Sequence, residues 1–293
     1  MLTADVPQVS RWRKLREDVL AADLQTQAHL LQQAADAARA TVVQTISRAG
    51  LGHVGGDLSV LDILTVLYAA VLRVDPERPD WTDRDRLVLS KGHCAVSLYT
   101  TLARCGYFPA AALSTFTGPL SELNGHPDRK KVPGVETNTG PLGHGFPFAV
   151  GAAIAGRLAA SQRRVFVVLG DGELQEGSNW EAMMTAGHRE LGNLVAVVDR
   201  NRLQQGDRTE STNRLDPLAP KWRSFGWQAE EIDGHDPVAL LQALSAPASG
   251  QPRCLIANTV KGKGVSFMED RVEWHHKVPS QDQAEMAIAE LTR

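Results

Sequence analysis

The chain has 293 residues, of which 43% are hydrophobic and 22% are charged, and its formal net charge is -3. This composition is typical of a globular protein that can bury a sizeable core, and it excludes a low-complexity or fibrous chain. The slightly acidic balance leaves no positive field that would attract nucleic acid or anionic lipid.

The N-terminal sequence becomes charged at once, and it has no apolar core of signal-peptide length. No run of residues approaches the ~20 apolar positions of a membrane span. The three cysteines, Cys94, Cys105 and Cys254, form no CxxC pair and are interpreted as buried thiols in a reducing compartment. The sequence therefore predicts a cytoplasmic protein.

Two helices are predicted early in the chain, after an N-terminal extension over residues 1–23. Residues 24–47 are rich in Ala, Leu and Gln with apolar positions at helical spacing, which indicates one long helix. A glycine-broken loop follows at residues 49–56. Ser59 is a good N-cap for a second helix, which is expected to run to about Leu72.

The next stretch predicts a strand-turn-helix unit and a long loop. Residues 85–90 are typical of a short strand, and Lys91-Gly92-His93 turns the strand into a helix that starts near Ala95. Residues 118–145 are rich in Gly, Pro, Asn and Thr, and their length is unusual for a structureless connection, which indicates a binding loop. A further helix is expected over residues 147–160.

Buried strands alternate with helices in the second half of the chain. Strands are predicted at residues 165–169, 194–198, 226–232 and 253–258, with helices at residues 176–191 and 237–246. This alternation indicates an α/β fold, with a parallel sheet covered by helices on both faces. The sequence contains no internal repeat and no flexible linker, so residues 24–293 are assigned to one domain.

Two of the predicted strands end in loops that carry oxygen ligands, at Gly170-Asp171-Gly172 and at Asp199-Arg200-Asn201. A right-handed crossover makes these strands parallel and adjacent, which places Asp171 and Asn201 together at the carboxyl edge of the sheet. A carboxylate, an amide and a free backbone carbonyl beyond Asn201 suit Mg²⁺ when phosphate oxygens complete its octahedron. Gly172 lets the backbone approach the phosphates, and its N–H can donate to them at a helix start.

Either loop end alone is more often a simple turn between a strand and a helix. The two together, thirty residues apart around one βαβ unit, indicate a site. The run from Gly170 to Gln204 resembles the thiamine diphosphate signature, which opens with GDG and closes on an Asn. This resemblance implies that Asp171, Asn201 and the carbonyl of Leu203 bind Mg²⁺, or Ca²⁺ or Mn²⁺ in its place, and that Gly172 contacts the diphosphate.

Five further segments resemble transketolase, in the same order and over almost the whole chain. They are Gly52-His53, Ser90-Lys91-Gly92-His93, Gly125-His126-Pro127, Gly140-Pro141-Leu142-Gly143, and Lys261-Gly262-Lys263-Gly264 with Trp274-His275. A lone loop histidine is more often a solvated surface residue, but several histidines beside glycines indicate a polar cavity. Residues 24–293 therefore resemble the diphosphate-binding domain of a transketolase, which implies the thiamine diphosphate-binding fold.

Transketolases move a two-carbon ketol unit from a ketose to an aldose, which requires groups that exchange protons near neutral pH, as imidazole does. The resemblance implies that His53 and His275 handle the donor C3 hydroxyl and the acceptor oxygen. It also implies that His126 holds the C1 hydroxyl and that His93 lies near the diphosphate and the donor. Lys261, fourteen residues before His275 as in the family, adds positive charge near the diphosphate.

The resemblance also assigns residues around the rest of the cofactor. Gly140 and Leu142 resemble the loop that meets the aminopyrimidine and supports the V-shaped cofactor with an apolar side chain. Glu176 and Glu181 fall five and ten residues after Asp171, where transketolases carry carboxylates that join two active sites across a subunit interface. The alternative interpretation is that Glu176 and Glu181 are ordinary glutamates on a helix surface.

Three positions depart from the pattern of full-length transketolases. They are Lys91 where Asn is common, His144 where Gln is common, and His276 where Gly usually follows the Trp-His pair. Lys91 resembles the residue at this position in the shorter, split transketolases. His144 and His276 add imidazole near the site, which bears on substrate preference.

A full-length transketolase has about twice this length or more, with pyrimidine-binding and C-terminal domains after the matched part. The resemblance therefore implies a second transketolase subunit that carries those domains, an α2β2 heterotetramer, and sugar or sugar-phosphate substrates. Three alternatives remain. The first is the α subunit of a 2-oxoacid dehydrogenase or another thiamine enzyme, which would not need the histidine set. The others are a non-catalytic homologue and a zinc hydrolase, although no HxH or HExxH spacing occurs.

Overall fold

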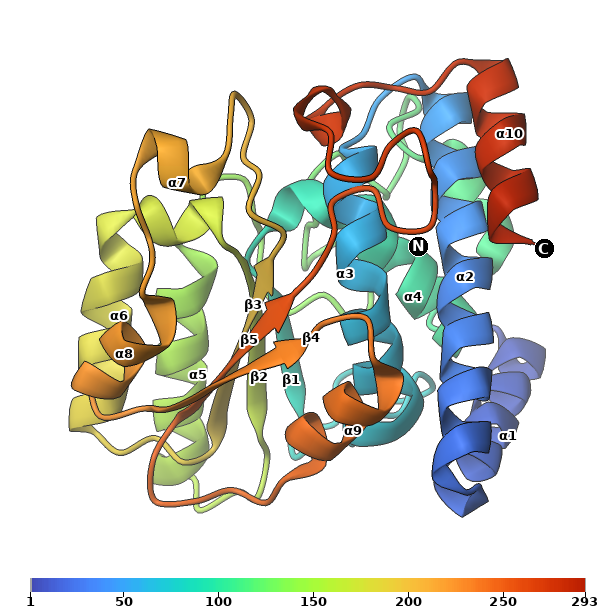
Figure 1. The fold of residues 1–293 in the computed structure, drawn as a ribbon. Coiled ribbons are helices and arrows are strands. Elements are labelled where there is room, and N and C mark those ends of the chain that lie inside the picture. Colours follow the sequence, from blue (N-terminus) through green and yellow to red (C-terminus); the bar gives the residue numbers. More distant parts are fainter. Residues whose placement is uncertain (1, 293) are drawn as a thin grey trace.

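Within residues 2–292, which this computed structural model describes, five parallel strands form one sheet in the order β1-β2-β3-β5-β4 (Figure 1). The strands are β1 (Arg86–Leu89), β2 (Val165–Gly170), β3 (Leu194–Arg200), β4 (Gln228–Asp233) and β5 (Arg253–Asn258). All neighbouring strands run in the same direction. The predicted α/β fold with a parallel sheet is therefore confirmed.

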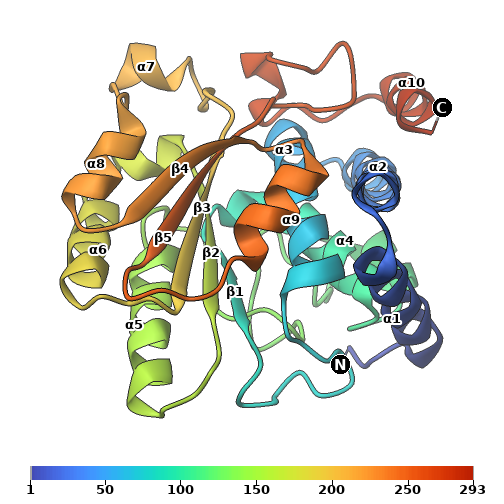
Figure 2. The same cartoon turned by 60° about the horizontal axis from the view of Figure 1, so that its bottom comes forward.

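Helices cover both faces of this sheet (Figure 1, Figure 2). One face is covered by α5 (Gly145–Leu158), α6 (Gly177–His188) and α8 (Leu218–Ser224). The other face is covered by α3 (Val54–Val66), α4 (Ala95–Cys105) and α9 (Pro237–Ser245). Outside this second layer lie α1 (Val6–Ala21), α2 (Leu24–Ala49) and α10 (Gln281–Leu291), and the short α7 (Thr209–Thr212) follows β3.

Side chains that alternate along β2 show why both faces need cover. Phe166 and Val168 belong to the apolar cluster that includes α2, α3 and α4, whereas Val165, Val167 and Leu169 belong to the cluster of α5, α6 and α8. All five side chains are fully buried. The continuous apolar sequence of this strand is therefore that of a parallel strand with a core on each side.

The second predicted helix begins earlier than the sequence indicated. His53 is the N-cap of α3, and Ser59, predicted as the N-cap, is buried inside the helix. The loop glycines Gly55 and Gly56 are helical instead, and they let the helix pack closely at this end: a Cβ at Gly55 would lie 2.7 Å from the carbonyl oxygen of Trp274. The hydroxyl of Ser59 donates to the Asp199 carboxylate, with an Oγ to Oδ2 distance of 2.7 Å.

A π-helical turn, Leu67–Val71, continues α3. Within the described residues, 54–71 is the one helical stretch long and apolar enough to cross a membrane by length and composition. Inside the protein, 83% of it is buried, so it serves as the central helix of the core. The three cysteines are also buried and unpaired, as predicted.

The predicted long loop is present, because residues 116–144 form turns and bends without a helix or strand. Strands β2 and β3 are adjacent and parallel, as predicted, and Gly170 lies beside Asp199 in the register. However, β3 runs to Arg200, two residues beyond its predicted end. The strand can include Asp199 and Arg200 because both charges are paired inside the protein, with Lys91 and Asp171.

Candidate active site

The loops that follow β2 and β3 meet at the carboxyl edge of the sheet, as the sequence predicted. Asp171 Oδ2 accepts a hydrogen bond from the backbone N–H of Arg202 at 2.6 Å, so a side chain of the first loop holds the second. Asn201 Oδ1 accepts from the N–H of Leu203 at 3.1 Å. The N–H of Gly172, expected to face a phosphate, donates to Asp171 Oδ1 at 2.8 Å in this structure.

Asp171 and Asn201 line one cavity of about 360 Å³ at this edge. Nearly all of the site residues predicted from the sequence line the same cavity: His53, His93, His126, Gly140, Leu142, Asp171, Gly172, Asn201, Leu203, Lys261 and His275. The two exceptions are Glu176 and Glu181, which are exposed at the start of α6. Residues that lie far apart in the sequence are thus brought together by the fold.

The cavity wall contains a cluster of imidazole rings. The ring of His53 lies 5.2 Å from that of His93, 5.7 Å from that of His275 and 4.5 Å from that of His276, measured between centroids. Burial, together with the nearby His276, His126 and Lys261, lowers the pKa of His53 to about 4. Burial and Lys261 lower the pKa of His275 to about 3. Both rings are therefore neutral at pH 7.

Lys261 contacts His275 directly, with 2.7 Å between Nζ and Nδ1. Burial and the charge of Lys91 lower the pKa of Lys261 to about 8, so the amine remains mostly an ammonium at pH 7. An ammonium can only donate, so His275 Nδ1 accepts and its proton lies on Nε2. Lys261 therefore selects the tautomer of His275.

Lys91 lines the cavity and is paired with Asp199, a partnership that the sequence did not reveal. The Lys91 ammonium and the Asp199 carboxylate form an ion pair in which both side chains are buried. Burial by itself would lower the pKa of Lys91, but the Asp199 carboxylate raises it above its usual value. Burial by itself would raise the pKa of Asp199, but the Lys91 ammonium lowers it. The hydroxyls of Ser59 and Thr259 also donate to Asp199. Lys91 thus brings a fixed positive charge to the cavity.

Glu173 is a buried acid of the cavity that was not predicted from the sequence. Its carboxylate accepts from the backbone N–H of Gly143 and from that of Gly170, each at 3.1 Å, and from the hydroxyl of Ser90. Burial raises its pKa. It thereby joins the end of β2 to two of the predicted binding loops. The available signal in the sequence was an acidic residue directly after the Gly-Asp-Gly turn.

The shifted histidine pKa values predict a dependence of stability on pH. His53 has a pKa of about 4 in the folded chain against 6.5 for an unperturbed histidine, so between these values the unfolded chain binds more protons. The free energy of unfolding is therefore expected to fall as the pH is lowered from 6.5 towards 4. Urea denaturation of the wild type and of His53→Asn across this range measures the effect.

The His53→Asn curve is expected to be shallower by at most one proton, about 1.4 kcal/mol per pH unit. The imidazoles and amines around His53, namely His93, His126, His275, His276, Lys91 and Lys261, are present in both proteins. Their contribution therefore cancels to first order. Parallel curves for the two proteins would show that His53 is not depressed in the folded chain.

A known protein family matches most of this chain, including all of the residues that line the cavity. The sequence model of the family described as transketolase, thiamine diphosphate binding domain, matches residues 30–289. The chain belongs to this transketolase family. The recognition from the Gly-Asp-Gly signature and the histidine segments is thus confirmed, as is the thiamine diphosphate-binding fold.

Similar transketolase sequences include two that are named as subunits and have about the same length as this chain. One, from the apulose-4-phosphate transketolase of Actinobacillus succinogenes, is 48% identical, over 85% of this chain and 91% of the relative. The other, from the 6-deoxy-6-sulfo-D-fructose transketolase of Clostridium sp., is 41% identical, over 90% of this chain and 96% of the relative. These two relatives are named as subunits of a transketolase, and this chain matches them over nearly their full length.

Solved transketolase structures have the same fold over a longer chain. A transketolase from Leishmania mexicana superposes with a TM-score of 0.85 at 29% identity, over 90% of this chain and 41% of that chain. A transketolase variant from Pichia stipitis gives 0.84 at 30% identity, over 89% and 41%. The chain thus spans about two fifths of these transketolases.

The cavity fits a thiamine diphosphate held through a divalent cation. The described residues contain no group of three or more His, Cys, Asp or Glu side chains placed for a metal, so a cation here would need amide, carbonyl and phosphate oxygens as further ligands. Gln204 Oε1 and His126 Nδ1 are buried without a hydrogen-bond partner, and both residues line the cavity. Gly140 has φ of +149° with no atom within 4 Å of a Cβ position, which leaves open space beside its backbone.

Proposed function

We propose that this chain is the diphosphate-binding subunit of a split transketolase, which transfers a two-carbon ketol unit from a ketose or ketose phosphate to an aldose. The observation that carries the proposal is the convergence in one cavity of the Asp171 and Asn201 oxygens with His53, His93 and His275. The metal signature alone suits many thiamine enzymes. The histidine cluster supplies the side chains that can exchange protons with the hydroxyls of a sugar substrate.

In the proposed site, Asp171, Asn201 and the carbonyl of Leu203 would hold Mg²⁺, which would bind the diphosphate to this edge of the sheet. Lys91 and Lys261 place two positive charges beside the diphosphate, and Gln204 offers a buried amide. Bound thiamine diphosphate supplies the electron sink for cleaving a carbon–carbon bond next to a carbonyl.

The histidines of the proposed site handle protons. His53 is neutral at pH 7, so it can accept the proton of the donor C3 hydroxyl as the C2–C3 bond breaks. His275 carries its proton on Nε2, opposite the nitrogen that Lys261 holds, so it can donate to the acceptor oxygen. His126, with an unpartnered Nδ1, is placed to hold the C1 hydroxyl.

The partner in this proposal is a second subunit with pyrimidine-binding and C-terminal domains, and the assembly is α2β2. Support comes from the relatives named as subunits, which this chain spans over 91% and 96% of their length.

Exposed apolar side chains on α5 and α6 offer a contact surface, namely Phe148, Leu158 and Met184. Glu176 and Glu181 are exposed at the start of α6 and are assigned to the link between active sites across this interface. We place the complex in the cytoplasm, where the three unpaired thiols stay reduced.

The test uses the chain purified with its partner subunit, thiamine diphosphate and Mg²⁺. Ketose consumption with aldose extension is followed for apulose 4-phosphate, 6-deoxy-6-sulfofructose, xylulose 5-phosphate and fructose 6-phosphate. At least one of these donors is expected to be consumed. The His53→Asn complex serves as a matched control, which should bind the cofactor equally and turn over about 10²- to 10⁴-fold more slowly.

Three results would contradict the proposal, each in favour of a different function or organisation. Oxoacid decarboxylation without ketose consumption would indicate a 2-oxoacid dehydrogenase-type subunit. Cofactor binding with no turnover of any donor would indicate a non-catalytic homologue. Full ketol transfer by this chain without the partner would refute the split organisation.

A further inference from the structure

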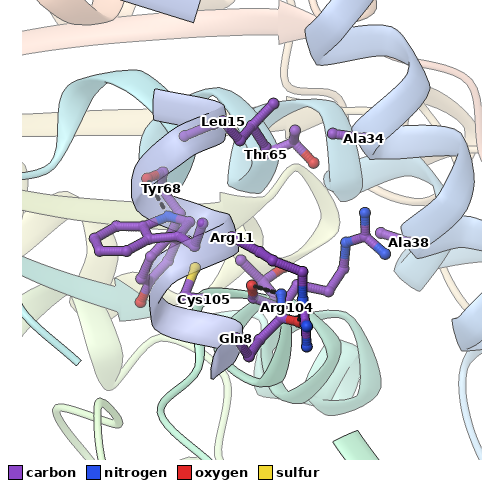
Figure 3. Close-up of a pocket in the computed structure, with 12 residues that line it drawn as sticks. Gln8, Arg11, Leu15, Ala34, Ala38, Thr65, Tyr68, Arg104 and Cys105 are labelled. Atoms are coloured by element: carbon purple, nitrogen blue, oxygen red, sulfur yellow. Dashed lines mark hydrogen bonds between the residues drawn. The ribbon is translucent and has the colours of Figure 1, made fainter. Parts of the chain in front are cut away.

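A second pocket lies far from the catalytic cavity, between α1 and the core helices. It has a volume of about 340 Å³, and its lining comes from α1, α2, α4 and the end of α3 with its π-helical turn. The two cavities share no lining residue. Figure 3 shows Gln8, Arg11 and Arg104 gathered at one side of this pocket, with Tyr68 and Leu15 on the other.

The pocket is positively charged and has no counter-charge of its own. Among residues 2–292, no carboxylate pairs with Arg11 or Arg104: the exposed Arg11 donates from Nε to Gln8 Oε1 at 2.9 Å, and the guanidinium of the half-buried Arg104 has no hydrogen bond to any of these residues. Burial lowers the pKa of Arg104. A third cation, Arg16, donates to the backbone carbonyl of Tyr68 beside the pocket. A half-buried guanidinium without a partner costs free energy that an anion would recover.

The rest of the lining is apolar. The rings of Trp12 and Tyr68 are nearly buried, as is the methyl group of Ala38, and all three line the pocket. The volume falls at the lower end of the range for small-molecule sites, which are mostly apolar with a few placed polar groups. This lining would accommodate the hydrocarbon part of a ligand whose charged head meets the two arginines.

Hydrogen bonds from α1 side chains to backbone carbonyls fix α1 against the π-helical turn and against α4 at the pocket. The π-helical turn frees the carbonyl of Tyr68, which accepts from Trp12 Nε1 at 3.1 Å and from Arg16 at 2.6 Å. Gln8 Nε2 donates to the carbonyl of Arg104 at 2.5 Å. Since α1 ends before residue 30, where the family match begins, one wall of the pocket lies outside the catalytic domain.

We propose that this pocket binds a small organic anion with an apolar body. Its carboxylate or phosphate head pairs with the guanidiniums of Arg11 and Arg104, whose planar donors suit either group. Its body packs against Trp12, Tyr68 and Ala38. The site is independent of the catalytic cavity and of the reaction proposed there.

The test is calorimetric titration of the purified chain with 4-phenylbutyrate, and with its uncharged amide as the matched probe. Phenylbutyrate is expected to bind saturably and at least about tenfold more tightly than the amide, since a charge-assisted hydrogen bond contributes about that factor. Arg104→Gln should lose about tenfold in affinity. Ala38→Leu keeps both charges but fills the pocket, so it should abolish binding.

Two controls locate the binding. Lys14→Gln removes one positive charge from the exposed face of α1 and should bind like the wild type. Saturating thiamine diphosphate with Mg²⁺ should leave phenylbutyrate affinity unchanged. The inference is wrong if no saturable binding occurs up to about 10 mM. It is equally wrong if Arg104→Gln and Ala38→Leu, with wild-type circular dichroism, both bind normally.

Discussion

The Asp171→Asn variant, measured with the partner subunit present, is expected to bind thiamine diphosphate and Mg²⁺ at least about 100-fold more weakly than the wild type, a loss of ~2.7 kcal/mol. The substitution keeps the shape of the side chain but removes the single anionic oxygen ligand that this chain offers the cation in the proposed site. Asp171 is buried at the end of β2, where its carboxylate also holds the N–H of Arg202. Calorimetric titration of the cofactor at fixed Mg²⁺ measures the loss.

Glu210→Gln provides the matched control for this substitution. Asp171 and Glu210 both form ion pairs with Arg200, so each variant removes one carboxylate from the same guanidinium. Only Asp171 lines the cavity. Cofactor affinity should therefore be nearly unchanged in Glu210→Gln. Equal losses in the two variants would mean that the effect passes through Arg200, and the metal role of Asp171 would be wrong.

The second large effect is expected from the buried ion pair beneath the cavity. Lys91→Met should lower the free energy of unfolding by about 3–5 kcal/mol, because it leaves the Asp199 carboxylate buried without its cation. The side chains of Lys91 and Asp199 are 1% and 0% exposed, so water cannot replace the lost partner. Urea denaturation of the apo chain measures the change without involving the cofactor.

Two further variants separate this effect from a general loss of lysine. Lys14→Met removes the cation of an ion pair with Asp18 whose side chains are 68% and 46% exposed, and it should change the free energy of unfolding far less than Lys91→Met does. Lys91→Met combined with Asp199→Asn removes both buried charges and should recover much of the stability. If Lys91→Met is no more costly than Lys14→Met, the buried pair is not the source of stability inferred here.

The convergence of Asp171 and Asn201 was predictable from the sequence for a topological reason. A strand, a helix and a second strand almost always form a right-handed parallel unit, so the two loop ends are forced to one edge of the sheet. The structure pairs β2 with β3 and ties the loops through Asp171 and Arg202. The sheet itself was also predictable from the sequence. Apolar runs such as Val165–Gly170 place apolar side chains on both faces of the sheet, so helices must bury both faces.

Other features depended on contacts between distant segments. Ser59 has the chemistry of an N-cap, yet it lies within α3, which begins at Val54, and its hydroxyl donates to Asp199 instead. The role of Glu173 was missed because its partners, Ser90 and Gly143, come from loops far away in the chain. Local propensity contains no information about such partners.

The sequence by itself determined which chemistry this chain carries: the Gly-Asp-Gly and Asn loop ends, the histidines beside glycines, and the strand-helix alternation that brings loop ends to one edge. Only the tertiary structure decided that the Lys91 ammonium forms a buried ion pair with Asp199, that Lys261 sets the tautomer of His275, and that α1 leaves a charged pocket against α4. The physical reason is that residue types and spacing follow from the chain, whereas burial, charge pairing and unfilled space arise from segments that meet only on folding.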